Sequence, residues 1–175
     1  FDLPAIYRLM GRTKLYINGG GSLIQDVTSR RSLWYYLFTL RMAKRRGCKV
    51  LMYGCGIGPV KHPKDIALTR QTLHGCVDAL TLREDSSLTE LQRFGVTNPE
   101  IVLASDPALT LQRAAEADID RMMEQNGLTP HGSYLAICLR DCPGFAEKAP
   151  VFAAPLRSAR SDHGLTPFFF SLYHL

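Results

Sequence analysis

Short apolar segments alternate with segments of helical pattern along most of this 175-residue chain. Each apolar segment has the length of a strand, and each connection between them is long enough for a helix. This order is typical of a parallel sheet covered by helices on both faces, so the sequence predicts an α/β protein. We expect strands over residues 14–18, 49–53, 78–82, 100–104, 134–139 and 165–172, and helices over residues 29–46, 63–76, 87–94, 118–126 and 145–161.

A run of turn-forming residues at 128–132 separates a short predicted helix from a new predicted strand. We therefore place a domain boundary near Gly127, with one domain over residues 1–127 and a second over residues 128–175. The chain begins within a helical pattern and ends on a very apolar segment, which would need neighbours on both faces if it were a strand. From these two ends we expect both domains to be incomplete.

The charge of the chain is modest, at +5, but much of the excess lies in one segment. A basic cluster can contact anionic lipid, nucleic acid or a phosphorylated substrate, or it can simply complement the dipole at a helix C-terminus. We expect no nucleic-acid partner and keep peripheral contact with an anionic membrane open. The cluster consists of Arg30, Arg31, Arg41, Lys44, Arg45, Arg46 and Lys49.

The cysteines and the hydropathy pattern indicate a reducing compartment. The five cysteines form no C-x-x-C pair, and no histidines stand at zinc-ligand spacing beside them, so we expect no metal. Cysteines within apolar strands are small buried hydrophobes in proteins of a reducing compartment. No apolar run approaches the roughly 20 residues of a membrane span. We expect a cytoplasmic protein, with the inner face of the membrane as an alternative location.

Two glycine-rich segments follow the first two predicted strands, at residues 19–22 and 54–58. Glycine has no Cβ, so the backbone N–H groups of such a segment can approach a ligand closely. Neither segment is a Walker loop or a G-x-G-x-x-G fingerprint. A tight strand-to-helix turn is the alternative for the first segment, and a bend before Pro59 is the alternative for the second.

The carboxyl ends of parallel strands meet at one edge of a sheet, where ligands bind. Polar or glycine residues follow five of the predicted strands, and they form our candidate site. These are Gly19, Gly20, Gly21, Ser22, Gln25, Asp26 and Thr28 after the first strand, Gly54, Gly56 and Gly58 after the second, Arg83 after the third, Asp106 after the fourth and Arg140 after the fifth.

Each charged candidate also has a structural alternative. The Arg83 guanidinium can clamp a carboxylate or phosphate with two hydrogen bonds, or it can pair with Glu84 or Asp85. Asp106 precedes a proline, a position at which aspartate usually organises a turn. Asp26 is either a base or a cap close to the following helix.

Four of these segments, in this order and spacing, resemble the motifs of the CsaB-type polysaccharide pyruvyl transferase family. They are GGGSLIQDVTSRRSL at 19–33, YGCGIGP at 53–59, DALTLRE at 78–84 and SDPA at 105–108. The resemblance extends over roughly residues 14–140. It implies a glycosyltransferase-B-like fold, in which two Rossmann-like domains have the active site between them.

The same resemblance implies transfer of a pyruvyl group from phosphoenolpyruvate to a sugar, which forms a cyclic ketal without a metal or an organic cofactor. In the bacterial cell-wall branch the acceptor is a lipid-linked precursor that contains N-acetylmannosamine, and the pyruvylated glycan anchors surface-layer proteins. Arg83 matches the arginine of the family after the third of these strands, and we assign it to the donor. Asp26 is our candidate for orienting or deprotonating the acceptor hydroxyl.

Two other functions stay open from the residues alone. One is a nucleotide-sugar glycosyltransferase of the same fold, which would need an acidic ribose-binding residue and a pyrophosphate loop in the second domain. The other is a non-catalytic, membrane-associated binding module that uses the basic segment between Arg30 and Lys49.

Overall fold

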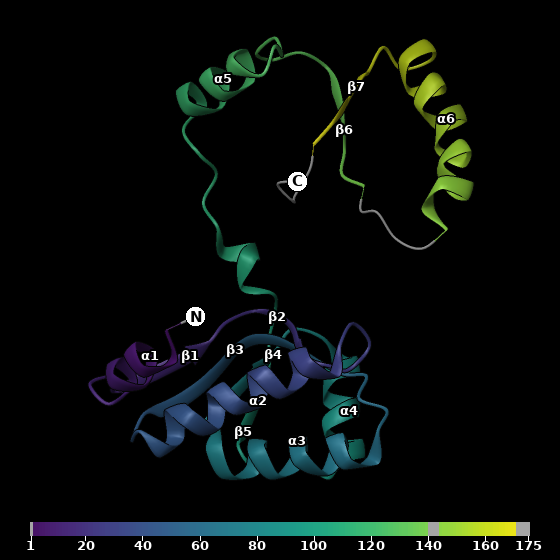
Figure 1. Ribbon diagram of the computed structural model, residues 1–175. Coiled ribbons are helices and arrows are strands. Elements are labelled where there is room, and N and C mark those ends of the chain that lie inside the picture. The colour runs from purple at the N-terminus through teal and green to yellow at the C-terminus, as the bar shows by residue number, and fades with distance from the viewer. Residues whose placement is uncertain (1, 140–143, 171–175) are drawn as a thin grey trace. The chain divides into compact units, whose positions relative to one another are not determined.

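The computed structural model describes residues 2–139 and 144–170 of the chain. Contacts divide the chain into two compact units, Phe1–Leu111 (unit 1) and Gln112–Leu175 (unit 2). The sequence placed the boundary near Gly127, whereas the contacts place it ahead of α5 (Glu116–Gln125), so that helix groups with the second unit. Figure 1 shows the elements of both units.

Unit 1 is a Rossmann-like α/β unit in which strands and helices alternate. The helix predicted over residues 63–76 has those bounds in the structure, and the other elements begin and end within a few residues of the prediction, except the second strand. The elements are α1 (Leu3–Met10), β1 (Leu15–Asn18), β2 (Gly21–Ile24), α2 (Arg30–Arg45), β3 (Lys49–Ile57), α3 (Pro63–Cys76), β4 (Ala79–Leu82), α4 (Asp85–Phe94), β5 (Glu100–Leu103) and the short 3-10 helix η1 (Pro107–Thr110).

The sheet of unit 1 is parallel throughout, with the order β1-β3-β4-β5. β2 also pairs with β3, further along the same strand: β1 faces Lys49–Met52, and β2 faces the segment from Cys55 to Ile57. β1 and β2 therefore form one edge strand that is interrupted at Gly19 and Gly20. The register of β3 also shifts between Met52 and Cys55, where β3 has one more residue than β4.

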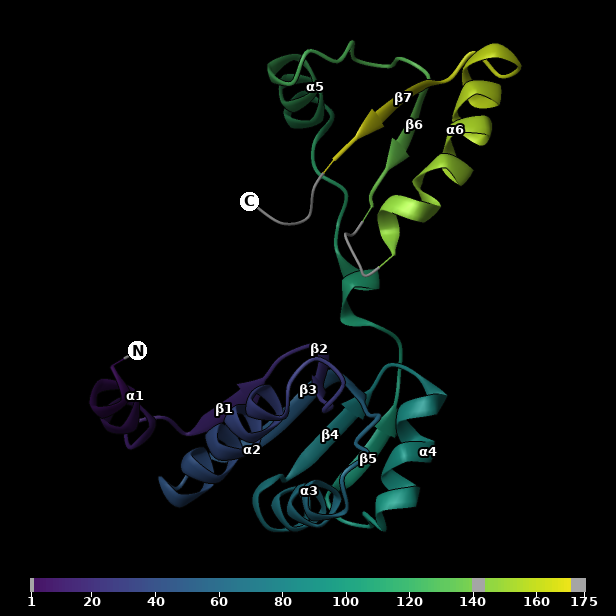
Figure 2. The same ribbon diagram turned by 45° about the vertical axis from the view of Figure 1, so that its right-hand side comes forward.

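The helices α2, α3 and α4 cover one face of this sheet (Figure 2). Side chains that point to that face, such as Val50 and Met52, are almost completely buried. On the opposite face, Ile17, Tyr53 and Val102 keep about half of their surface exposed. The prediction of helices on both faces is thus wrong for the described residues of unit 1, where helices cover a single face.

The ends of the helices follow local sequence signals in most cases. Ser29 caps α2 by accepting a hydrogen bond from the N–H of Arg31, and Gly95 ends α4 in the left-handed conformation. The Ser-x-x-Glu spacing at 87–90 resembles a capping box in the sequence, but the helix does not start there: α4 begins at Asp85, two residues ahead of the predicted start, with Glu84 as its N-cap residue. Ser87 therefore lies inside the first turn of the helix.

Unit 2 is built around a small parallel sheet of β6 (Tyr134–Ile137) and β7 (Thr166–Phe169). They are connected through α6 (Phe145–Ser161), whose bounds are those predicted from the sequence. Both Pro150 and Pro155 lie inside this helix. Rings of the two strands pack against each other, with the centroids of Tyr134 and Phe168 5.8 Å apart.

A carboxylate ties the end of α2 to the sheet of unit 1. Asp78 accepts hydrogen bonds from Lys44 Nζ at 2.9 Å, from the backbone N–H of Val50 at 2.9 Å and from Lys49 Nζ at 3.2 Å. Partial burial opposes ionisation of this carboxyl, but the hydrogen bonds outweigh it and lower the pKa of Asp78 to about 2. The bonds to Asp78 also assign Lys44 and Lys49 a structural role.

We expect Asp78→Asn to lower the free energy of unfolding by about 1–2 kcal/mol at neutral pH, a value reduced for partial solvent screening. A carboxyl with a depressed pKa stabilises the folded state above its unfolded pKa, and this contribution is lost as the pH falls from about 4 towards about 2. Urea unfolding of both proteins over that range measures the difference. Asp118→Asn, in an exposed pair with Arg121, is the control and should change little. A deficit that does not depend on pH would contradict the assignment.

Candidate functional site

Three predicted site residues from three different segments meet at the carboxyl edge of the sheet in unit 1. Arg83 follows β4 directly, Ser22 lies in β2, and Asp106 precedes η1. Arg83 Nη1 donates to Asp106 Oδ2 at 2.8 Å, and Arg83 Nη2 donates to Ser22 Oγ at 3.4 Å. We call Ser22, Arg83, Glu84 and Asp106 the Arg83 cluster. Parallel pairing from β2 to β5 brings these residues together although they lie far apart in the sequence.

Two glycines in β3 make room for this cluster. A Cβ on Gly56 would lie 2.5 Å from Ser22 Oγ and 2.8 Å from Glu84 Oε1, and a Cβ on Gly54 would lie 2.5 Å from the ring of Pro107. These distances are shorter than van der Waals contact, so any side chain at either position would displace its neighbours. Gly54 also has a φ of +62°, which only glycine adopts without strain. Glycine is therefore needed here for close packing.

The structure corrects, for part of the predicted glycines, the prediction that they lie in loops whose N–H groups can approach a ligand. Gly21 and Ser22 lie in β2, and β3 runs through Gly54, Cys55 and Gly56. The N–H of Gly54 donates to Thr81 Oγ1 at 2.7 Å, and the N–H of Gly58 donates to Ile24 O at 2.7 Å. These two N–H groups are already used within the fold. Gly19, Gly20 and Gly58 remain as the predicted glycines outside strands.

The Arg83 guanidinium pairs with Asp106 and with neither of the adjacent acidic residues that we considered as alternatives. Its side chain keeps 27% of its surface exposed, so solvent reaches part of this side chain. Asp106 also organises a turn, as the following proline suggested: its Oδ1 accepts from the N–H of Ala108 at 2.9 Å. This hydrogen bond and the one from Arg83 hold the pKa of Asp106 below its usual value. Asp106 is therefore a carboxylate at neutral pH.

Sequence reasoning missed Glu84 and Ser87 as polar residues that support the cluster. The buried Ser87 hydroxyl donates to Glu84 Oε1 at 3.0 Å and accepts from the N–H of Ile57 at 2.7 Å. This fixes the Glu84 carboxylate, which lies next to the position a Cβ of Gly56 would take. The E-x-x-S spacing of Glu84 and Ser87 was the sequence signal for this contact. The S-x-x-E spacing of Ser87 and Glu90, which begins three residues later, suggested a later helix start instead.

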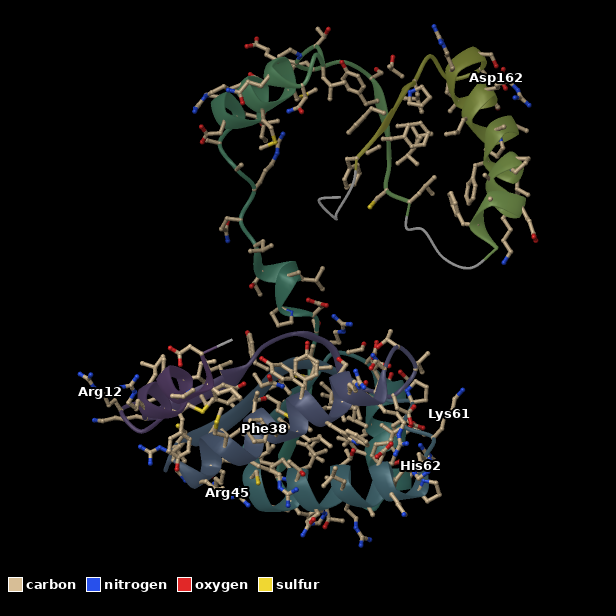
Figure 3. The ribbon with its side chains drawn as sticks, viewed as in Figure 1. Arg12, Phe38, Arg45, Lys61, His62 and Asp162 are labelled. Atoms are coloured by element: carbon tan, nitrogen blue, oxygen red, sulfur yellow. The ribbon has the colours of Figure 1, made fainter. Side chains whose placement is uncertain are left out.

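Asp26 lies in a separate turn, which it shares with Gln25 and Thr28. Its Oδ2 accepts from the N–H of Lys61 at 2.8 Å and from the N–H of His62 at 3.3 Å, and so it holds the segment that leads into α3. Gln25 donates from Nε2 to Thr28 Oγ1 at 2.6 Å and accepts two backbone N–H groups of the turn. Within the described residues, no hydrogen bond or ion pair joins this turn to the Arg83 cluster. Figure 3 labels Lys61 and His62.

Two further residues bear on the chemistry of the site. Cys55 lies between the two glycines of β3, and its burial raises the pKa of the thiol to about 11 in spite of the charge of Arg83. The thiol therefore stays protonated and is not a nucleophile at neutral pH.

Arg140 lies outside the described residues. Among those that are described, no three His, Cys, Asp or Glu side chains are grouped so that they could hold a metal ion.

A guanidinium, a hydroxyl and tightly packed glycines at the carboxyl edge of a parallel sheet are typical of α/β proteins that bind small anionic ligands. The comparison with protein families gives a definite assignment. The family model described as polysaccharide pyruvyl transferase matches residues 3–163. The chain belongs to the polysaccharide pyruvyl transferase family. Searches of curated proteins and of solved structures returned no significant match.

Proposed function

We propose that the protein transfers a pyruvyl group from phosphoenolpyruvate to a sugar of a cell-wall or exopolysaccharide precursor and forms a cyclic ketal. Membership of the pyruvyl transferase family supports transfer of a pyruvyl group and favours it over transfer of a sugar from a nucleotide sugar. The observation that supports phosphoenolpyruvate as the donor is Arg83, whose partly exposed side chain lies at the sheet edge and donates to Ser22. Phosphoenolpyruvate carries a carboxylate and a phosphate, and a planar guanidinium binds either with two parallel hydrogen bonds.

The reaction asks for cationic groups, hydrogen-bond donors and an acid–base pair. A proton adds to the methylene carbon of the donor, a sugar hydroxyl attacks the central carbon, and a second hydroxyl closes the ring as phosphate leaves. One phosphate is thus released for each ketal. In our proposal Arg83 binds an anionic group of the donor while Asp106 holds the guanidinium in place. Ser22 provides a hydroxyl next to it.

Asp26 is our candidate for orienting or deprotonating the acceptor hydroxyl. Its Oδ2 is occupied by two backbone N–H groups, and within the described residues its Oδ1 has no hydrogen-bond partner. A role in catalysis would use that second oxygen. The fixed turn would keep it in one orientation, which is what a general base requires.

The wider setting of the reaction is also part of the proposal. We propose a lipid-linked or polymeric glycan as the acceptor, the CsaB type within the family, and a cytoplasmic location at the inner face of the membrane. We further propose that the transfer uses no metal and no organic cofactor. No helix among the described residues is long and apolar enough to cross a membrane.

A direct test incubates the protein with phosphoenolpyruvate and a glycoside of N-acetylmannosamine that has two free hydroxyls able to close a ring. Phosphate release and the mass of the glycoside are followed together, and binding of phosphoenolpyruvate alone is measured by calorimetry. We expect one phosphate for each glycoside that gains a pyruvyl group. A parallel reaction with a nucleotide sugar is the control. Product from the nucleotide sugar without any binding of phosphoenolpyruvate would replace our proposal by the glycosyltransferase.

A further inference from the structure

The outer side of the helix pair α1 and α2 presents aromatic side chains to solvent. Tyr7 of α1 is 47% exposed, and Tyr35 and Phe38 of α2 are 43% and 48% exposed. On α2 the two aromatic residues are three positions apart, so they lie on the same side of the helix. Large exposed aromatic residues that gather on one surface mark an interaction site. We call Tyr7, Tyr35, Phe38, Arg41 and Arg45 the α1–α2 surface.

Two hollows lie along this surface, with volumes of about 350 Å³ and about 290 Å³. The first is almost wholly apolar, with Leu3, Ile6 and Met10 of α1 among its lining residues. The second is lined by Tyr7, Phe38, Arg41, Met42 and Arg45. Phe38 and Met42 line both hollows and connect them. The surface thus joins an apolar depression to one with a cationic rim.

The charge of the two helices has one sign. Neither α1 nor α2 contains an aspartate or glutamate, whereas α2 alone contains five arginines and lysines. Two of these five have structural partners, because Arg30 pairs with Asp65 and Lys44 pairs with Asp78. Within the part of the chain that the structure describes, Arg41 and Arg45 form no ion pair. Their charges remain available to a partner.

Arginines at the ends of these helices extend the positive charge. The guanidinium of Arg46 stacks on the ring of Tyr7, with its carbon 4.3 Å from the ring centroid. Figure 3 labels Arg12, which follows α1, and Phe38 and Arg45 of α2. The basic segment noticed in the sequence is therefore divided by the fold. Lys44, Lys49 and Arg30 hold the unit together, while Arg41 and Arg45 border the aromatic surface.

We propose that the α1–α2 surface docks the protein on the surface of a bilayer that contains anionic lipid. Tyrosine and phenylalanine rings on a protein surface can insert into the headgroup region of a bilayer. Arginine can bury its alkyl stem there while its guanidinium reaches lipid phosphates. A surface with apolar and basic groups side by side is typical of proteins that bind to the surface of a membrane. The apolar hollows favour a bilayer over a nucleic acid. This docking does not depend on the transfer reaction.

The test is cosedimentation of the full chain with phosphatidylcholine vesicles, with and without phosphatidylglycerol. We expect binding when the anionic lipid is present and weak binding to phosphatidylcholine alone. The double variant Arg41→Glu/Arg45→Glu should lower the partition coefficient by roughly 25-fold or more, since each basic residue near an anionic surface contributes about fivefold. Raising the salt concentration should weaken binding of the unaltered protein in the same direction.

A matched variant separates this surface from net charge. Lys64→Glu/Arg70→Glu makes the same change in net charge on α3 and should bind almost as well as the unaltered protein. Phe38→Ser should weaken binding severalfold even at high salt, whereas Leu109→Ser, at a position that is 78% exposed on η1, should not. Circular dichroism of each variant verifies that it is folded.

Three results would overturn the proposal. The unaltered protein could stay in the supernatant with phosphatidylglycerol vesicles. The two charge-reversal pairs could weaken binding equally, which would mean a non-specific effect of net charge. A short RNA could displace the protein from vesicles, with its binding sensitive to Arg41 and Arg45 and insensitive to Phe38, which would make the partner a nucleic acid.

Discussion

Replacing Arg83 by Ala is expected to lower kcat/KM for phosphoenolpyruvate by roughly 30- to 900-fold, which corresponds to the 2–4 kcal/mol lost with one preorganised donor. The guanidinium is fixed by Asp106 at 2.8 Å and lies 3.4 Å from Ser22 Oγ, so it is ordered before any donor binds. Its removal should also abolish calorimetric binding of phosphoenolpyruvate. The fold should survive, because Asp106 keeps its hydrogen bond to the N–H of Ala108.

Two further variants sharpen this test of Arg83. Arg83→Lys keeps the charge but loses the planar pair of donors, so we expect it to recover only part of the lost activity. Arg70→Ala removes an exposed arginine on α3, outside the cluster, and should leave kinetics unchanged. Unchanged kcat/KM and unchanged donor binding in Arg83→Ala would exclude this residue from the donor site while leaving the family assignment intact.

The second large effect is expected at Gly54, for Gly54→Ala. We expect the free energy of unfolding to fall by about 2–4 kcal/mol, because a side chain in the left-handed region and a forced overlap each contribute. The new Cβ would lie 2.5 Å from two carbons of Pro107, so the segment that carries Asp106 must move. Activity should therefore fall together with stability.

Gly19→Ala is the matched control for Gly54→Ala, because it makes the same chemical change at a site with no neighbouring atom within 4 Å. Its φ also lies outside the left-handed region. Its stability should change by less than about 1 kcal/mol. Both variants are compared by urea unfolding and by the steady-state rate. Equal losses in the two variants would show that the packing of β3 against Pro107 is not what makes Gly54 necessary.

The order of elements could be predicted from the sequence because each signal is local. Proline at the start of α3, serine ahead of α2 and glycine after α4 each act within one turn of the helix, and each stands at that helix end in the structure. The position of α4 shows where local reading fails. Two overlapping patterns, E-x-x-S and S-x-x-E, begin three residues apart, and the contact between Ser87 and the N–H of Ile57 selects the first. That contact is long-range and invisible in a window of sequence.

Only part of the candidate site could be predicted, because part of it depends on long-range packing. The meeting of Ser22, Arg83 and Asp106 follows from parallel topology, which alternation of strands and helices predicts well. The glycine segments were predicted to be loops because each of them follows a short apolar segment of strand pattern. Pairing of β2 and β3 beyond the interruption at Gly19 and Gly20 could not be foreseen, since it depends on neighbours that pack where side chains are missing.

The bare stretch of β3 has a consequence for how substrate preference can change in this protein. A strand without side chains at Gly54 and Gly56 offers no side-chain group to a ligand. A side chain added at either position would displace the neighbouring residues, which are Pro107 at Gly54 and Ser22 and Glu84 at Gly56. Every functional group above it is contributed by an adjoining segment. Altered selectivity should therefore arise by exchange of residues at 22, 83, 84 and 106, while the two glycines act as a constant template beneath them.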